Sequence, residues 1–92
     1  MTVYMVERNL PGIGLDELAA AQKAAIVAAR DMRRQGSSIR YIRSTFVPGR
    51  GRCMCLFEAG SPGLVKQLND AAGIPYEAIV EACDLTPNSP DS

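Results

Sequence analysis

Glycine and proline divide this sequence into six segments, and the type of each segment decides what the chain can fold into. The breaks fall at residues 11–12, 36, 48–51, 61–62 and 73–75. Such residues end helices and strands because glycine adopts turn conformations that other residues avoid and proline lacks a backbone donor. Each segment between two breaks is long enough for one helix or one strand.

The residue pattern of each segment predicts either a strand or a helix. β-Branched and aromatic residues predict strands, and apolar residues spaced three or four apart predict helices. The expected order is a strand over residues 2–8, a helix over 15–35, strands over 39–47 and 52–59, a helix over 62–72 and a strand over 78–85. This β-α-β-β-α-β order predicts an α+β, ferredoxin-like sandwich, in which a four-stranded antiparallel sheet carries both helices on one face.

Each expected helix has one apolar stripe that should pack on the sheet. In the first helix the stripe is Leu18, Ala21, Ala25, Ala28 and Met32. In the second helix it is Leu64, Leu68 and Ala71.

The expected sheet is apolar on both faces. On the third strand Cys53, Cys55 and Phe57 point one way, while Met54 and Leu56 point the other way. An antiparallel sheet with one face in water should alternate apolar and polar residues. We therefore expect a homodimer that pairs through the open sheet face.

Length and composition set the organisation of the chain. The 92 residues suffice for one domain, which we expect over residues 1–87, followed by a flexible C-terminal tail over 88–92. Ten basic and ten acidic residues cancel, which disfavours a nucleic-acid or membrane-surface protein. Three cysteines without a disulfide pattern, and no signal peptide, indicate the reducing cytoplasm.

The absence of histidine restricts the chemistry most. It excludes Ser-His and Cys-His nucleophile pairs and imidazole zinc sites. Cys53 and Cys55 form a C-x-C pair that suits a soft metal, although buried small hydrophobes are the favoured interpretation. Glu7 is a candidate metal ligand or base and Arg8 a candidate anion binder, although a solvated pair or a cross-strand ion pair is the favoured interpretation.

Several stretches also resemble a family of small bacterial ferredoxin-like proteins, formerly of unknown function, that includes a nickel-binding, nickel-responsive actinobacterial protein. The resemblance covers residues 3–87. It rests on Tyr4-Met5-Val6-Glu7-Arg8 with Pro11-Gly12, on Ile42-Arg43-Ser44, on Cys55-Leu56-Phe57-Glu58-Ala59, on Ala72-Gly73-Ile74-Pro75 and on Asp84-Leu85-Thr86-Pro87.

The resemblance implies a dimer and binding of a divalent metal such as nickel. Many members carry histidine where this chain has Arg43 and Leu68, and arginine cannot ligate a cation. The metal ligands that remain as candidates are Glu7, Cys55 and Glu58. The candidate ligand-binding residues are Tyr4, Arg8 and Arg43.

Three functions stay open at this point. The first is a non-enzymatic binding or stress-type protein, with or without nickel. The second is a cofactor-independent monooxygenase or isomerase of the dimeric α/β-barrel type, which requires a pocket with at least two of Tyr4, Glu7, Arg43 and Glu58. The third is an RNA-binding module that uses the arginines and aromatic residues between Arg40 and Arg52. The third strand lacks the aromatic octapeptide of sheet-surface RNA binders, which makes nucleic acid the least favoured partner.

Overall fold

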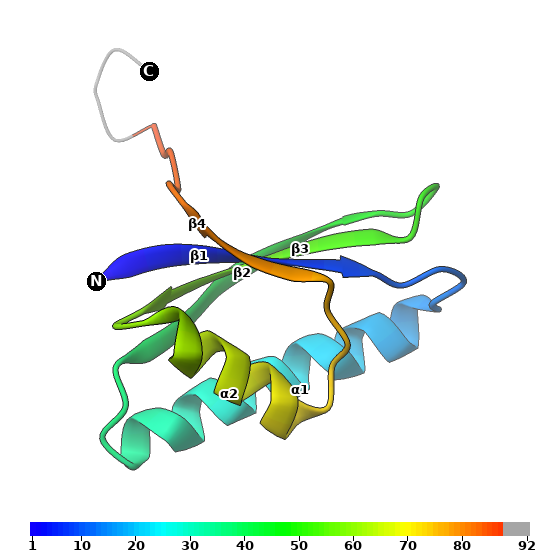
Figure 1. Cartoon of the computed structure of the whole chain (residues 1–92). Coiled ribbons are helices and arrows are strands. Elements are labelled where there is room, and N and C mark those ends of the chain that lie inside the picture. Colours follow the sequence, from blue (N-terminus) through cyan, green and yellow to red (C-terminus); the bar gives the residue numbers. More distant parts are fainter. Residues whose placement is uncertain (88–92) are drawn as a thin grey trace.

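The computed structural model describes residues 1–87 and has the expected order of elements. These are β1 (Thr2–Asn9), α1 (Leu15–Arg34), β2 (Ile39–Val47), β3 (Arg52–Ala59), α2 (Pro62–Ala72) and β4 (Ala78–Ala82). The strands form one antiparallel sheet in the order β2-β3-β1-β4, and both helices lie on one face of it (Figure 1). This is the ferredoxin-like sandwich that the sequence predicts. The expected flexible tail at 88–92 lies outside the described residues.

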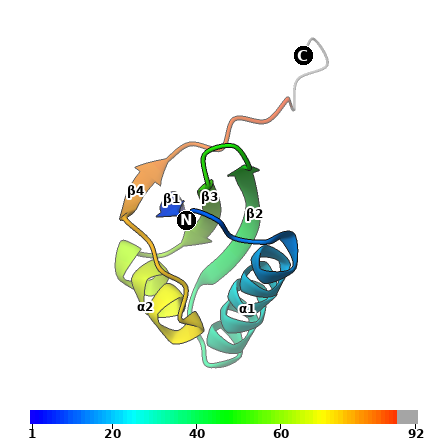
Figure 2. The ribbon, with the colours of Figure 1, turned by 90° about the vertical axis from the view of Figure 1, so that its right-hand side faces the viewer.

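The last strand is shorter than expected because the chain turns away from the sheet after Ala82. Figure 2, which looks along the sheet, shows the following segment on the face opposite the helices. There Asp84 forms an ion pair with Arg43 of β2, while Cys83 and Leu85 are exposed. The expectation that residues 83–85 continue the strand is therefore wrong.

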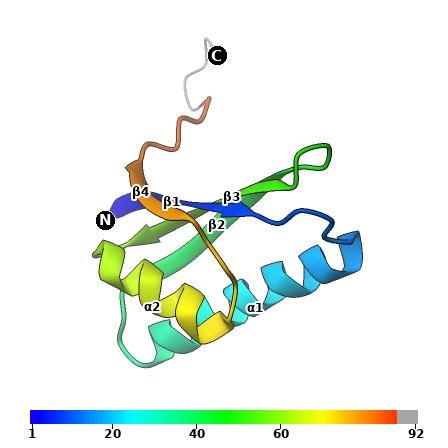
Figure 3. The same ribbon diagram turned by 45° about the vertical axis from the view of Figure 1, so that its right-hand side comes forward.

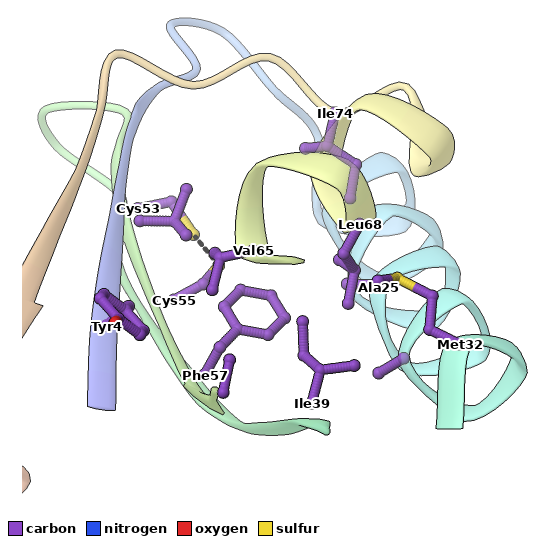
Figure 4. Close-up of a cluster of buried hydrophobic side chains, with 13 residues drawn as sticks. Tyr4, Ala25, Met32, Ile39, Cys53, Cys55, Phe57, Val65, Leu68 and Ile74 are labelled. Atoms are coloured by element: carbon purple, nitrogen blue, oxygen red, sulfur yellow. Dashed lines mark hydrogen bonds between the residues drawn. The ribbon is translucent and has the colours of Figure 1, made fainter. Parts of the chain in front are cut away.

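Both helices lie against one side of the sheet (Figure 3), and the buried residues of the core come from these two layers. Val6, Phe57, Val65 and Leu68 are fully buried there, and aliphatic side chains surround them. Figure 4 shows Cys53, Cys55 and Phe57 on the helix side of β3, as the alternation on that strand predicts.

The buried helix faces differ in detail from the expected stripes. On α1, Ala25 and Met32 are buried as expected, and Ala29 is buried as well. On α2, Val65, Leu68 and Asn69 are buried and Ala71 is exposed, so the expectation for Ala71 is wrong. Residues 65, 68 and 69 are neighbours on the helix surface, and residue 71 lies about 110° from their centre at 100° per residue.

A β-bulge in β2 has consequences for the helix side of the sheet. Tyr41 pairs with Phe57 and Arg43 with Leu56, so Ile42 is the extra residue. In a regular strand, residues 41 and 44 would point to opposite faces because side chains alternate. Because of the bulge, the side chains of Tyr41 and Ser44 both point to the helix side of the sheet.

Within residues 1–87, no second layer of helices lies on the opposite sheet face. Val3, Met5, Met54 and Leu56 lie on it half-buried, and Val80 is exposed. Among residues 1–87, no helix combines the length and the apolar character needed to cross a membrane.

Candidate ligand-binding cavity

A cavity of about 230 Å³ lies between α1 and the helix side of the sheet. Its walls combine aliphatic side chains from α1 and the β1–α1 loop with polar side chains from β1, β2 and β3. The wall residues are Arg8, Leu10, Leu15, Leu18, Ala19, Ala21, Gln22, Ala25, Tyr41, Ser44, Phe46, Cys53, Cys55 and Ile74.

Arg8 is the one formally charged residue in this wall, and it is only 1% exposed. Alternation along β1 places it there, because Tyr4, Val6 and Arg8 all point toward the helices. Its Nε donates to Cys55 Sγ at 3.4 Å, and its Nη1 donates to the Pro75 carbonyl at 3.2 Å. Its Nη2 donates to Asn69 Oδ1 at 2.5 Å.

No carboxylate neutralises this guanidinium within the part of the chain that the structure describes. None of the ion pairs within residues 1–87, taken as nitrogen–oxygen distances up to 4.0 Å, includes Arg8. The favoured interpretation from the sequence, a solvated Arg8 or a cross-strand ion pair, is therefore wrong for Arg8. Burial of a charge without a counterion is costly, and hydrogen bonds to neutral acceptors offset only part of that cost.

A chain of hydrogen bonds continues from Cys55 to the helix. Ser44 Oγ donates to Cys55 Sγ at 2.9 Å, and it shares a hydrogen bond of 2.6 Å with the Tyr41 hydroxyl. Gln22 of α1 donates its Nε2 hydrogen to the same hydroxyl at 3.0 Å. These contacts depend on the bulge in β2, because it brings Tyr41 and Ser44 to one face.

Cys53 is a neutral thiol at ordinary pH. Burial raises the pKa of Cys53 to about 11, and the neighbouring Cys55 adds to this effect while Arg8 opposes it. The two sulfur atoms are 3.9 Å apart. Metals bind the thiolate, so a metal at Cys53 would have to displace its proton. Both cysteine side chains are buried, which agrees with their interpretation as small hydrophobes.

The expected metal ligands lie on different faces of the sheet. Cys55 points toward the helices, whereas Glu7 pairs with Met54, and Glu58 with Val3, on the opposite face. Glu58 also contacts Arg40 at 3.4 Å. Residues 1–87 contain no group of three Cys, Asp or Glu side chains arranged to hold a metal ion. The residues present do not fit a nickel site within one protomer.

The other expected ligand-binding residues are similarly dispersed. Arg8 lines the cavity, but Tyr4 packs in the core and is not part of the wall. Arg43 is exposed on the open face, where Asp84 pairs with it. Leu68, at the second expected histidine position, is fully buried in the core.

Four polar residues of the site are not among those that the sequence singles out. Gln22, Tyr41 and Ser44 meet through the bulge, which no residue pattern in β2 indicates. Asn69 fixes Arg8 from α2, where it is fully buried. The expected stripe of Leu64, Leu68 and Ala71 does not include this position, so it gives no signal for the burial of Asn69.

The fold defines this chain as a small ferredoxin-like α+β protein. Residues 4–82 match the model of a protein family described as nickel responsive protein SCO4226-like, and the chain belongs to this family. The resemblance found in the sequence is thereby confirmed. The crystal structure of SCO4226 from Streptomyces coelicolor A3(2) superposes with a TM-score of 0.76 at 22% identity, over 91% of this chain and 99% of that one. At this identity the likeness establishes the fold. No curated protein matches the chain.

Proposed function

We propose that this chain is a non-enzymatic binding protein of the nickel-responsive family and that its ligand occupies the cavity beside Arg8. The observation that carries the proposal is the position of Arg8, which is 1% exposed, lines the cavity and has no carboxylate partner among residues 1–87. Burial of a charge without a counterion is costly, and a ligand in the cavity would offset part of that cost. The cavity is also mostly apolar with a few polar groups, as ligand sites usually are.

The proposal assigns no metal to the side chains of one protomer. Glu7 and Glu58 lie on the face opposite Cys55, and the Arg8 charge next to Cys55 repels a cation. Burial raises the pKa of Cys53 to about 11, which disfavours the thiolate that a metal binds. This member of the family has, on this proposal, kept the fold without a nickel site inside the protomer.

We also propose that the protein acts as a cytoplasmic homodimer. Met5, Met54, Leu56 and Val80 lie on the open sheet face, and a second copy would cover these apolar side chains. The three cysteines are free thiols, which supports a reducing compartment.

The alternative of a monooxygenase or isomerase has no support from the cavity. Its wall includes none of Tyr4, Glu7, Arg43 and Glu58, the polar groups that this alternative requires.

Two titrations test the proposal. The first is an isothermal titration with nickel chloride of the Cys83→Ser variant, in which the exposed thiol is removed. It should give no binding heat at micromolar metal. Stoichiometric nickel binding by this variant would contradict the assignment. The second titration follows backbone amide NMR signals while butyrate, butyramide, butylamine or butanol is added at millimolar concentration. At least one compound should shift signals around Ser44 and Ala25, and no shift with any of them would refute the cavity as the ligand site.

A further inference from the structure

We infer that the Arg8 end of the cavity binds the carboxylate of a small aliphatic acid. This inference rests on the proposed function and names the chemical class of its ligand.

The guanidinium of Arg8 has donors to spare. It carries five N–H groups, and Cys55, Pro75 and Asn69 accept one bond each from Nε, Nη1 and Nη2. Every buried side-chain nitrogen in the described chain has a partner, so Arg8 is held in place. One further N–H remains on each terminal nitrogen. Nη1 and Nη2 bond to Pro75 and Asn69, which lie outside the cavity wall, so a carboxylate in the cavity would have to draw the guanidinium toward it. The two free N–H groups would then match the two oxygens of the carboxylate.

The charge of the cavity wall selects an anion. Arg8 is its only formally charged residue, and no Asp or Glu belongs to the wall. The remaining polar groups are neutral donors and acceptors, namely Gln22, Tyr41 and Ser44. A charge interacts more strongly in a buried site than in water because the effective dielectric constant is lower. A cationic ligand would meet repulsion here, and a neutral ligand would leave Arg8 without a counterion.

The rest of the wall selects an organic anion over an inorganic one. Leucine, alanine, phenylalanine and isoleucine side chains make up most of the surface around Arg8. An aliphatic tail would cover this surface, whereas phosphate would leave it against water. The volume of about 230 Å³ is below the roughly 300–1,000 Å³ of sites for drug-sized ligands. The ligand is therefore a short-chain acid, with butyrate and hexanoate as suitable probes.

The experiment compares each acid with its amide, because the two differ in charge and hardly in shape. Dissociation constants for butyrate, butyramide, hexanoate, hexanamide and inorganic phosphate are measured by amide NMR titration of the full chain. The protein variants are Arg8→Met, with Arg34→Met as a control that removes an exposed charge at the end of α1. Ala21→Met narrows the cavity and leaves Arg8 in place. Asn69→Asp places a carboxylate of the protein next to Arg8, where it competes with the carboxylate of the ligand. This variant replaces Arg8→Met in the experiment if Arg8→Met does not fold.

Hexanoate should bind at least roughly tenfold more tightly than hexanamide, since hydrogen bonds to charged groups are the stronger ones. Arg8→Met, Ala21→Met and Asn69→Asp should each weaken hexanoate binding, and Arg34→Met should not. Equal binding of acid and amide would overturn the anion inference and leave the cavity as a ligand site. Binding of neither compound would overturn both. Phosphate binding as tight as that of hexanoate, and insensitive to Ala21→Met, would overturn the assignment to an aliphatic acid.

Discussion

Replacement of Asn69 by alanine probes the support of the buried arginine. Asn69 is fully buried on α2, where its Oδ1 accepts from Arg8 at 2.5 Å and its Nδ2 donates to the Val65 carbonyl at 2.7 Å. A hydrogen bond to a charged group contributes about 1.5–3 kcal/mol and a neutral one about 1 kcal/mol. Asn69→Ala should therefore lower the free energy of unfolding by about 2.5–4 kcal/mol, a large share of the roughly 5–15 kcal/mol typical of a domain.

Urea denaturation followed by circular dichroism measures this loss. Both proteins must be at the same concentration, because the proposed dimer would make stability depend on it. The midpoint should fall while the slope against urea stays unchanged, since the same surface is exposed on unfolding. The matched control is Asn9→Ala at the exposed end of β1, which should change stability by no more than about 0.5 kcal/mol. A loss below about 1 kcal/mol for Asn69→Ala would refute the account of Arg8 as a buried charge held by specific acceptors.

Three further predictions concern Cys53, the β2–β3 turn and the open face. The pKa of Cys53 is raised to about 11 from its ordinary 9.0, so the unfolded chain loses this proton first as the pH rises. The stability of the wild type should therefore fall, relative to Cys53→Ala, between pH 9 and 11 and not below, and parallel pH profiles would contradict this. Gly51 has a φ of +64°, and a Cβ there would lie 2.9 Å from the Leu10 carbonyl oxygen. Gly51→Ala should cost about 2 kcal/mol in urea denaturation and Gly49→Ala close to nothing; equal costs would disprove the strain. Leu56→Arg on the open face should give monomers in light scattering, and a persistent dimer would place the interface elsewhere.

The order and type of the helices and strands follow from local signals in the sequence. Glycine and proline mark the ends of the elements, and alternation on β3 assigns Cys53, Cys55 and Phe57 to the helix side, where the structure has them. The end of β4 is not visible in this way, because Leu85 continues the apolar pattern. An ion pair between Asp84 and the distant Arg43 accompanies the departure of the chain from the sheet.

The candidate site is predicted only in part, and the reasons are physical. Arg8 is a candidate anion binder from its type, but its place at the end of a strand predicts a solvated or ion-paired side chain. Its burial without an acidic partner depends on Asn69 and the Pro75 carbonyl, which are 61 and 67 residues away in the chain. The metal candidates Glu7, Cys55 and Glu58 come from a resemblance and not from the alternation of side chains between the two faces of a strand. Residues 7 and 55 do not face the same way once β1 and β3 pair in the observed register.

The most direct test of the central claim is a crystal structure of the protein grown with bromobutyrate, whose bromine gives an anomalous signal. The account predicts one strong peak among the aliphatic side chains between α1 and the sheet, with the carboxylate in hydrogen-bond contact with both terminal nitrogens of Arg8. A cavity without bromine, or with the carboxylate turned away from Arg8, would contradict it.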